Sequence, residues 1–354
     1  MKKIYTAALV GCGRIGFSLG FDKKREQPAS HTMALKKNKR IKLVAGCDTD
    51  PVKLESWKRF VRCDKIYTDV SDMLRSCKTD IIAVAVNEEF HLSVTLDVIR
   101  SRPRLVILEK PVALNTGDAK KIYRTAKEFN VPVLVNHERR FALDYSAAAN
   151  YLSEIGDIQS IRGVLCSGLR VYSPEDEKTG AYSLLHDGTH LIDIILYFLE
   201  KLSGKEKKWL LYRPSLSGVY YDMEKPVVVR NLCANYKTDV CPDVSVTISG
   251  RSKFFAFEVE ITGTQGRICI GNGYMHFYKS RQSKLYTGFY SLEEDRFVRR
   301  PKRTLYFSNM VQNAVDFLDG KAPLGSSLED GINVMAVIDE IKEGLKKENG
   351  TLGN

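Results

Sequence analysis

A glycine-rich turn directly after an apolar strand is the feature that most constrains the fold of this chain. Residues 4–10 are suited to a buried strand, and Gly11-Cys12-Gly13-Arg14-Ile15-Gly16 follows them. Glycines at this spacing allow a tight turn, expose backbone amides to a pyrophosphate and let a helix pack on the strand. Residues 17–19 are expected to open that helix, whose N-terminus attracts phosphate. Six-residue glycine patterns also arise by chance, so the surrounding strands and helices must show whether this turn belongs to a dinucleotide-binding fold.

Strand-like and helix-like runs alternate through the first third of the chain, which supplies that context. The strand-like runs are residues 4–10, 41–47, 65–67, 81–86, 104–108 and 131–135. Helical runs such as 92–99 and 116–129 lie between them. Six strands alternating with helices predict an α/β fold with a Rossmann-type, doubly wound parallel sheet.

Asp48 follows the second strand-like run and is expected to bind the ribose of a dinucleotide. A carboxylate there accepts the ribose hydroxyls of NAD and repels a 2′-phosphate. No arginine follows it, so NAD is the expected cofactor and NADP the alternative. The long spacing from the glycines is explained by a charged insertion at residues 21–29, before a helix that Ser30 is expected to cap.

After residue 137 the pattern changes to consecutive strand-like runs with short turns. These runs are residues 158–169, 226–234, 244–249, 254–261, 267–270 and 275–278. They predict an α+β domain with a largely antiparallel open sheet. We therefore expect residues 1–137 to form the NAD-binding domain and residues 138–354 to bind substrate and mediate oligomerisation. Few helices are available to cover both sheet faces, which favours a homodimer or homotetramer.

Composition excludes several classes of protein. The net charge of +11 comes from scattered basic residues, whereas nucleic-acid binding needs a clustered stripe. No apolar run approaches the roughly 18 residues of a membrane span, and the first residues run straight into a strand, leaving no room for a signal peptide. The eight cysteines include no CxxC pair, so we expect reduced thiols in a cytoplasmic protein, without a disulfide frame or metal site.

Two segments carry residues suited to catalysis. Glu109-Lys110-Pro111 follows the fifth strand-like run, where an ammonium can stabilise a developing alkoxide. His186, His190 and Asp193 lie four and three residues apart in a run expected to be helical, 182–199, which would place them on one face. Gly188 in that run suggests the close approach of a ligand or another backbone.

Taken together, these motifs resemble the glucose–fructose oxidoreductase, inositol dehydrogenase and rhizopine-catabolism family, Gfo/Idh/MocA. The resemblance covers nearly the whole chain and includes Arg140-Phe141, Gly156-Asp157-Ile158, His190-Leu191-Ile192-Asp193 and the turn at residues 261–266. Glu109-Lys110-Pro111 is the most specific of its motifs. The chain departs from the family at Val86-Asn87, where Thr-Pro is common, and at His186, where many members carry aspartate.

The resemblance implies NAD(P)-dependent hydride transfer to or from a sugar, polyol, inositol or related hydroxy compound. It identifies Lys110 and His190 as catalytic residues. We expect His186 or Asp187 to support the proton transfer, and we take Arg140, Arg170 and Tyr172 as candidate substrate contacts. The residues expected to bind the cofactor are Gly11, Gly13, Arg14, Ile15, Gly16, Asp48, Asn87, His91, Glu109 and Lys110.

Three other functions are compatible with parts of the pattern. His186-Asp187-Gly188-Thr189-His190 resembles the H-E-x-x-H zinc helix, although a metal hydrolase would leave the glycine turn unexplained. Some relatives cleave glycosides with tightly held NAD, using the same residues. A nucleotide-sensing regulator is the third alternative, and the retained Lys110 and His190 argue against it.

Overall fold

The computed structural model describes residues 3–204 and 211–352. Its internal contacts divide the chain into two compact units. Unit 1 comprises residues 1–142 and 303–335, and unit 2 comprises residues 143–302 and 336–354. Residues 303–335 thus pack with the N-terminal unit although they follow the second sheet in sequence. The functional division at residue 137 stays a prediction.

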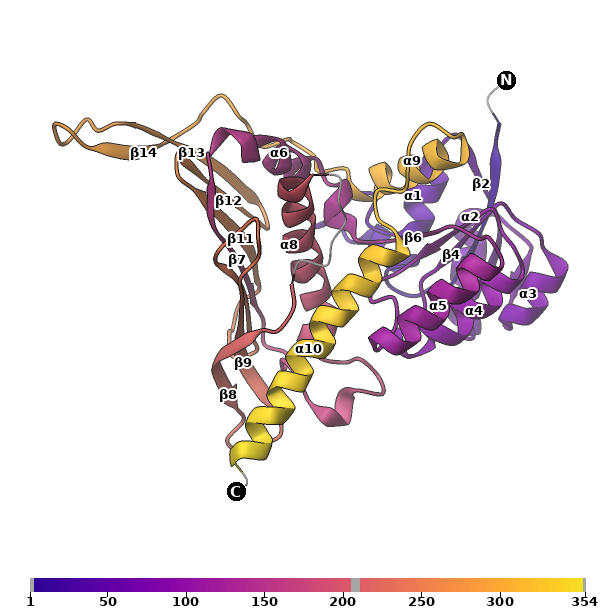
Figure 1. Cartoon of the computed structure of the whole chain (residues 1–354). Helices are drawn as coiled ribbons and strands as arrows, with labels where there is room; N and C mark the ends of the chain where they lie inside the picture. Colours follow the sequence, from indigo (N-terminus) through magenta and orange to yellow (C-terminus); the bar gives the residue numbers. More distant parts are fainter. Residues whose placement is uncertain (1–2, 205–210, 353–354) are drawn as a thin grey trace. The chain divides into compact units, whose positions relative to one another are not determined.

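Unit 1 is built on a six-stranded parallel sheet (Figure 1). Its strands are β1 (Tyr5–Val10), β2 (Ile41–Cys47), β3 (Ile66–Tyr67), β4 (Ile81–Val84), β5 (Leu105–Leu108) and β6 (Val133–Val135). The spatial order is β3-β2-β1-β4-β5-β6, so the direction of winding reverses between β1 and β4. Ligands bind at this reversal in doubly wound sheets. The Rossmann fold predicted from the sequence is confirmed.

Four of the described helices of unit 1 follow a residue whose side chain caps them, whereas the helices His91–Arg100 and Tyr306–Leu318 have no side-chain cap. Ser30, Asp50, Asp69 and Asn115 each accept a hydrogen bond from a backbone N–H of the following first turn. The helices are α1 (His31–Lys37), α2 (Pro51–Val61), α3 (Val70–Ser76), α4 (His91–Arg100), α5 (Thr116–Glu128) and α9 (Tyr306–Leu318), with short 3₁₀ turns η1 (Ser18–Phe21), η2 (Glu88–Phe90) and η3 (Glu138–Phe141). Helix α9 packs on α1 and on η3, which explains why this late segment belongs to unit 1.

The helix expected directly after the glycine turn does not form, and this prediction was wrong. The chain makes one helical turn, closed by the Phe17 N–H on the Gly13 carbonyl, and then the 3₁₀ turn η1. The Gln27 amide donates to the carbonyls of Leu19 and Asp22, which holds the insertion in turns of its own. A regular helix therefore starts only at His31, capped by Ser30 as expected.

Unit 2 contains an eight-stranded sheet in the order β14-β13-β12-β11-β7-β10-β9-β8. The strands are β7 (Ile158–Cys166), β8 (Ser215–Tyr221), β9 (Val229–Tyr236), β10 (Val244–Ser249), β11 (Ala256–Gly263), β12 (Gly266–Gly271), β13 (Tyr274–Gln282) and β14 (Tyr290–Glu294). Every pair is antiparallel except β7 with β10, which confirms a largely antiparallel sheet. The sequence analysis missed β8 and β14, whose exposed positions lack an apolar alternation.

Helices of unit 2 pack against this sheet. They are α6 (Leu143–Tyr151), α7 (Ser183–His186) and α8 (Gly188–Ser203), with 3₁₀ turns η4 (Leu152–Glu154) and η5 (Pro174–Asp176). Helix α8 contacts β7 and β10, and α6 contacts β12 (Figure 1). Helix α10 (Leu328–Leu352) has its first residues in unit 1 and continues in unit 2. No helix in the described ranges is both long and apolar enough to cross a membrane.

The single helix expected over residues 182–199 is divided in two, so that prediction was wrong. The shared face of His186, His190 and Asp193 stays a prediction. Helix α7 ends at His186, Asp187 forms a turn, and α8 starts at Gly188. A side chain on Gly188 would lie 3.1 Å from the Ile248 side chain and 3.2 Å from the Ser183 carbonyl oxygen. The close approach signalled by this glycine is therefore to the sheet and to the preceding turn.

Candidate functional site

A cavity of about 250 Å³ lies in unit 1 at the carboxyl ends of its central strands. It is bounded by the glycine turn after β1, by Asp48 after β2 and by Asn87 after β4. Apolar side chains form much of the remaining wall, together with Cys47, Thr49 and Lys53: Val10, Val70, Ala85, Val86, Phe90 and Val94. A carboxylate beside an apolar wall suits a nucleoside, whose ribose is polar and whose base is flat. The residues present therefore fit the dinucleotide that the sequence predicts.

The glycine turn is shaped by two close approaches and one open position. A side chain on Gly11 would lie 2.3 Å from the Ala85 carbonyl oxygen, and one on Gly16 would lie 1.9 Å from the Gly11 carbonyl oxygen. Among the described residues, no atom beyond the chain neighbours of Gly13 lies within 4 Å of the place that its side chain would take. Gly11 and Gly16 are thus required by the protein itself, whereas the space at Gly13 is available to a ligand. Arg14 is exposed and Ile15 is half-buried against the core.

Asp48 is held by the backbone on both carboxylate oxygens. The Cys12 N–H donates to Oδ2 at 2.7 Å, and the Asp50 N–H donates to Oδ1 at 2.8 Å. This fixes the carboxylate at the cavity wall with lone pairs left for further donors. One feature was missed in the sequence. Lys53, which the sequence analysis did not single out, also lines the cavity, and its ammonium lies 3.1 Å from the Asp50 carboxylate.

The segment 109–111 follows β5 and is anchored by buried groups. Oε1 of Glu109 lies 2.6 Å from His31 Nε2 and accepts a hydrogen bond from the Asn136 side-chain amide, also at 2.6 Å. Burial raises the pKa of Glu109, but the contact with His31 and the charge of Lys110 outweigh it, so the pKa is lowered overall. Glu109 therefore stays ionised beside Lys110, which is half-buried. The sequence contained no signal for His31 or Asn136.

His91 does not line the nucleotide cavity in this structure. It is 1% exposed, and its ring nitrogens face the carbonyl oxygens of Pro111 and Val86. Glu109 is likewise buried and does not line the cavity. Of the residues expected to bind the cofactor, those that line the cavity are Gly11, Gly13, Asp48 and Asn87.

The histidine segment lies in unit 2 at the break between α7 and α8. His186 is exposed, and Asp187 and His190 are half-buried. The His190 N–H donates to the Asp187 carbonyl at 3.1 Å, so Asp187 closes the first turn of α8. His190 and Asp193 remain three residues apart on α8, which places them on one helix face.

The three candidate substrate contacts differ in accessibility. Arg140 pairs with Asp330 at 3.2 Å, and both side chains are buried. Tyr172 is 3% exposed, and its hydroxyl donates to Glu177 at 2.8 Å. Arg170 is 40% exposed and pairs with Asp176 at 3.1 Å. Of these three, Arg170 is the one whose side chain a ligand can reach without breaking a buried contact.

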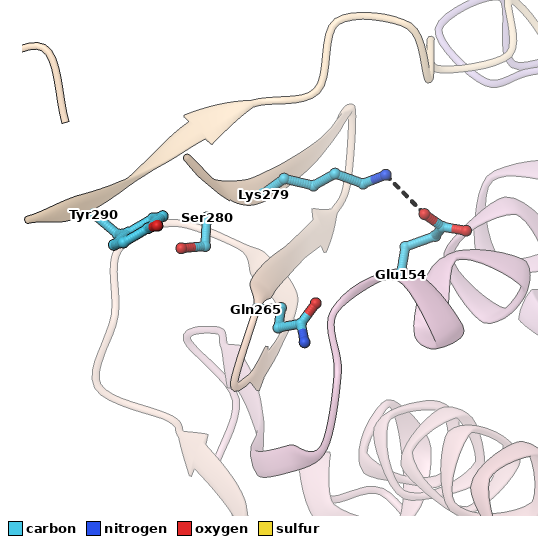
Figure 2. A pocket seen from close by; sticks show the side chains of 5 residues that line it. All are labelled: Glu154, Gln265, Lys279, Ser280 and Tyr290. Atoms are coloured by element: carbon cyan, nitrogen blue, oxygen red, sulfur yellow. Dashed lines mark hydrogen bonds and ion pairs between the residues drawn. The ribbon is translucent and has the colours of Figure 1, made fainter. Parts of the chain in front are cut away.

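A second cavity, of about 490 Å³, lies in unit 2 beside β13 and β14. Figure 2 shows Lys279 reaching toward Glu154, with Gln265, Ser280 and Tyr290 around them. The ammonium lies 2.7 Å from Glu154 and 3.6 Å from Asp295, so these charges compensate each other. None of these lining residues was assigned a function from the sequence. Within the described residues, no group of three His, Cys, Asp or Glu side chains could hold a metal ion.

Two buried histidines should make the stability of the protein depend on pH. Burial lowers the pKa of His91 and lowers that of His137 to about 3. Below about pH 6.5 the unfolded chain therefore binds protons that the folded chain does not, and the free energy of unfolding should fall toward pH 3. The slope is up to about 1.4 kcal/mol per pH unit for each histidine. Urea unfolding at pH 7, 6 and 5 measures it.

Replacement of one buried histidine tests this origin. His137→Gln removes one titrating group, so its unfolding free energy should vary less steeply with pH. His276→Gln is the matched control, because His276 is 45% exposed on β13. An unchanged slope in His137→Gln would contradict the assignment.

Comparison with known proteins agrees with the geometry of unit 1. Residues 5–137 match the model of the oxidoreductase family with an NAD-binding Rossmann fold, GFO_IDH_MocA. D-apiose dehydrogenase of Rhizobium rhizogenes is 23% identical over 271 residues, which are 75% of this chain and 73% of that protein. Further curated dehydrogenases match over 41% to 47% of their length.

Solved structures share the fold over almost the whole chain. A dehydrogenase from Chromobacterium violaceum has a TM-score of 0.79 at 15% identity, covering 99% of this chain and 98% of that one. An oxidoreductase from Agrobacterium radiobacter, in complex with NAD⁺, L-tartaric acid and magnesium, has a TM-score of 0.72 at 18% identity, covering 95% and 94%. The N-terminal part of the chain, residues 5–137 in unit 1, therefore contains the NAD-binding Rossmann fold of the Gfo/Idh/MocA oxidoreductase family.

Proposed function

We propose that this protein is an NAD-dependent dehydrogenase that transfers a hydride between the cofactor and a hydroxyl-bearing carbon of a sugar, polyol, inositol or related compound. The observation that carries the proposal is the nucleotide cavity, with the fixed carboxylate of Asp48 in its wall. Lys110 stands at the carboxyl end of β5 in the same sheet. The name of the D-apiose dehydrogenase relative supports a carbohydrate substrate.

Each proposed role follows from the chemistry of the side chain. Bound NAD supplies the site that accepts or returns the hydride. The Lys110 ammonium donates a hydrogen bond to the reacting oxygen and stabilises charge on it. The His190 imidazole takes the hydroxyl proton during oxidation and returns it during reduction. His186 or Asp187 supports that transfer, and Arg170 contacts the substrate.

A substrate screen is the first test. The purified protein is incubated with NAD and a panel of sugars, inositols and sugar acids, and NADH formation is followed by absorbance. Oxidation of at least one panel member is expected. Glycoside cleavage without net NADH would instead support the NAD-assisted alternative, and nucleotide binding without turnover of any panel member would support a regulator.

We expect NAD to bind roughly 10-fold or more tightly than NADP, because a hydrogen bond to a charged group contributes about 1.5–3 kcal/mol. Calorimetric titration of both cofactors measures the difference. Asp48→Ala should reduce the difference between the two affinities, chiefly by weakening the binding of NAD. Asp97→Ala is the matched control, because Asp97 is an exposed carboxylate on α4 that does not line the nucleotide cavity. Equal or tighter binding of NADP by the unmodified protein would contradict the preference.

The homodimer or homotetramer remains part of the proposal. Several large apolar side chains of the segment around β14 are exposed: Leu285, Tyr286, Phe289, Tyr290, Leu292 and Phe297. Exposed apolar clusters of this kind are typical of interaction surfaces. They support association of the chain through the sheet of unit 2.

A further inference from the structure

His91 occupies a place between two functional loops of unit 1. It is the first residue of α4 and is 1% exposed. Its Nδ1 lies 2.5 Å from the Pro111 carbonyl oxygen, and its Nε2 lies 3.0 Å from the Val86 carbonyl oxygen. One imidazole ring thus spans the backbone of both loops.

These two carbonyls belong to segments with different roles. Val86 and Asn87 line the nucleotide cavity. Pro111 directly follows Lys110, so the position of its carbonyl is tied to the backbone that carries the lysine. A shift of either segment changes its distance to the same ring.

The protonation chemistry of the ring makes the two contacts interdependent. Both facing atoms are carbonyl oxygens, which only accept hydrogen bonds, whereas a neutral imidazole carries a single N–H. Burial lowers the pKa of His91, so the ring is neutral at neutral pH. It therefore donates to one carbonyl at a time, and a gain at one contact weakens the other.

The other side of Lys110 is fixed by separate groups. Glu109 is held by His31 and Asn136, and its own N–H donates to the Val84 carbonyl of β4 at 3.0 Å. Unlike these contacts, the contact with His91 connects the segment to a loop that lines the cavity.

We propose that His91 is a positioning residue that couples occupancy of the nucleotide cavity to the placement of Lys110. A nucleotide that fixes the loop at Val86 and Asn87 leaves the ring proton on Nδ1, donated to Pro111, and so fixes the lysine segment. This inference rests on the proposed role of Lys110, but its test needs no substrate. Loss of the coupling and absence of dehydrogenase turnover are therefore separate results.

The test compares three variants at a temperature well below their melting points. His91→Leu removes both nitrogens, and His91→Gln restores an amide donor. Thr95→Val is the matched control, because Thr95 is buried one turn further along α4 and its hydroxyl has no hydrogen-bond partner in the described structure. Two quantities are measured: the Kd for NAD by calorimetry, and the rate at which an amine-reactive reagent modifies Lys110 in cofactor-free protein, by peptide mass spectrometry.

A coupling of ordinary size predicts roughly a 5-fold or larger change in both quantities for His91→Leu. His91→Gln should recover part of each, and Thr95→Val should change neither. A merely structural histidine would lower the melting temperature and leave both quantities unchanged. That result, or a change in only one of the two, overturns the proposal. If His91→Leu does not fold, His91→Asn, whose shorter amide cannot span both carbonyls, takes its place with the same expected outcome.

Discussion

His190→Ala should lower turnover roughly 10²–10⁴-fold while the affinity for NAD stays nearly unchanged. This is the usual contribution of a general acid or base. The carbon that bears the hydroxyl can lose a hydride only if the hydroxyl proton is removed at the same time. Gly13 and Asp48, which we propose bind the cofactor, lie in unit 1, whereas His190 lies on α8 of unit 2. Steady-state kinetics with a substrate from the screen, together with NAD calorimetry, measures both effects.

Lys110→Ala should reduce turnover by a similar factor, because the ammonium stabilises charge that develops on the reacting oxygen. If the two residues serve one chemical step, the double variant should lose less than the product of the two single losses, since groups that act as a unit are non-additive. Fully independent losses would indicate that Lys110 and His190 serve different steps.

The alternative is that His190 is a packing residue. Its half-buried position on α8 is compatible with that reading as well. A packing role predicts a lower melting temperature with turnover per folded molecule intact. Melting temperature and turnover of His190→Ala, measured on the same preparation, decide between the two. A destabilised but fully active variant would remove His190 from the mechanism.

The fold could be predicted from the sequence where burial alone determines an element. Parallel strands such as β4 and β5 are covered on both faces, so they appear as unbroken apolar runs. The exposed strands β8 and β14 form by pairing at the sheet edge, which leaves little mark on side-chain pattern. The break at Asp187 was missed because Gly188 is needed for an approach to Ile248, a contact between distant parts of the chain.

The sequence indicated which residues line the candidate site, but not which residues hold them in place. The sequence singles out Gly11, Gly13 and Asp48, and the structure places all three on the wall of one cavity. His31 and Lys53 approach the site from α1 and α2, at distances in sequence that no motif fixes. Arg140 shows the opposite case, because a residue in a recognisable motif proves to be held in a buried ion pair.

Substitutions in the glycine turn should have the second large effect. Neighbouring backbone leaves no room for a side chain at Gly11 or Gly16, whereas the space at Gly13 is open. In Gly11→Ala and Gly16→Ala the new side chain would meet backbone oxygens at 2.3 Å and 1.9 Å. The positive φ of +94° at Gly11 adds strain for any residue with a side chain. Both substitutions should destabilise unit 1 by about 3 kcal/mol or more, the range reached when backbone has to move.

Gly13→Ala should have the opposite effect: it should change the stability little and weaken the binding of NAD. Among the described residues, no atom beyond its chain neighbours lies within 4 Å of the added methyl group, so the free energy of unfolding should change by no more than about 0.5 kcal/mol. NAD affinity should fall roughly 10–100-fold if, as we propose, the backbone at this glycine approaches the pyrophosphate. Urea unfolding and NAD calorimetry on Gly13→Ala measure the two effects. Unchanged NAD binding would show that the open space at Gly13 is not used by the cofactor and would remove the turn from the proposed site. A loss of stability equal to that of Gly11→Ala would show instead that the protein fills this space.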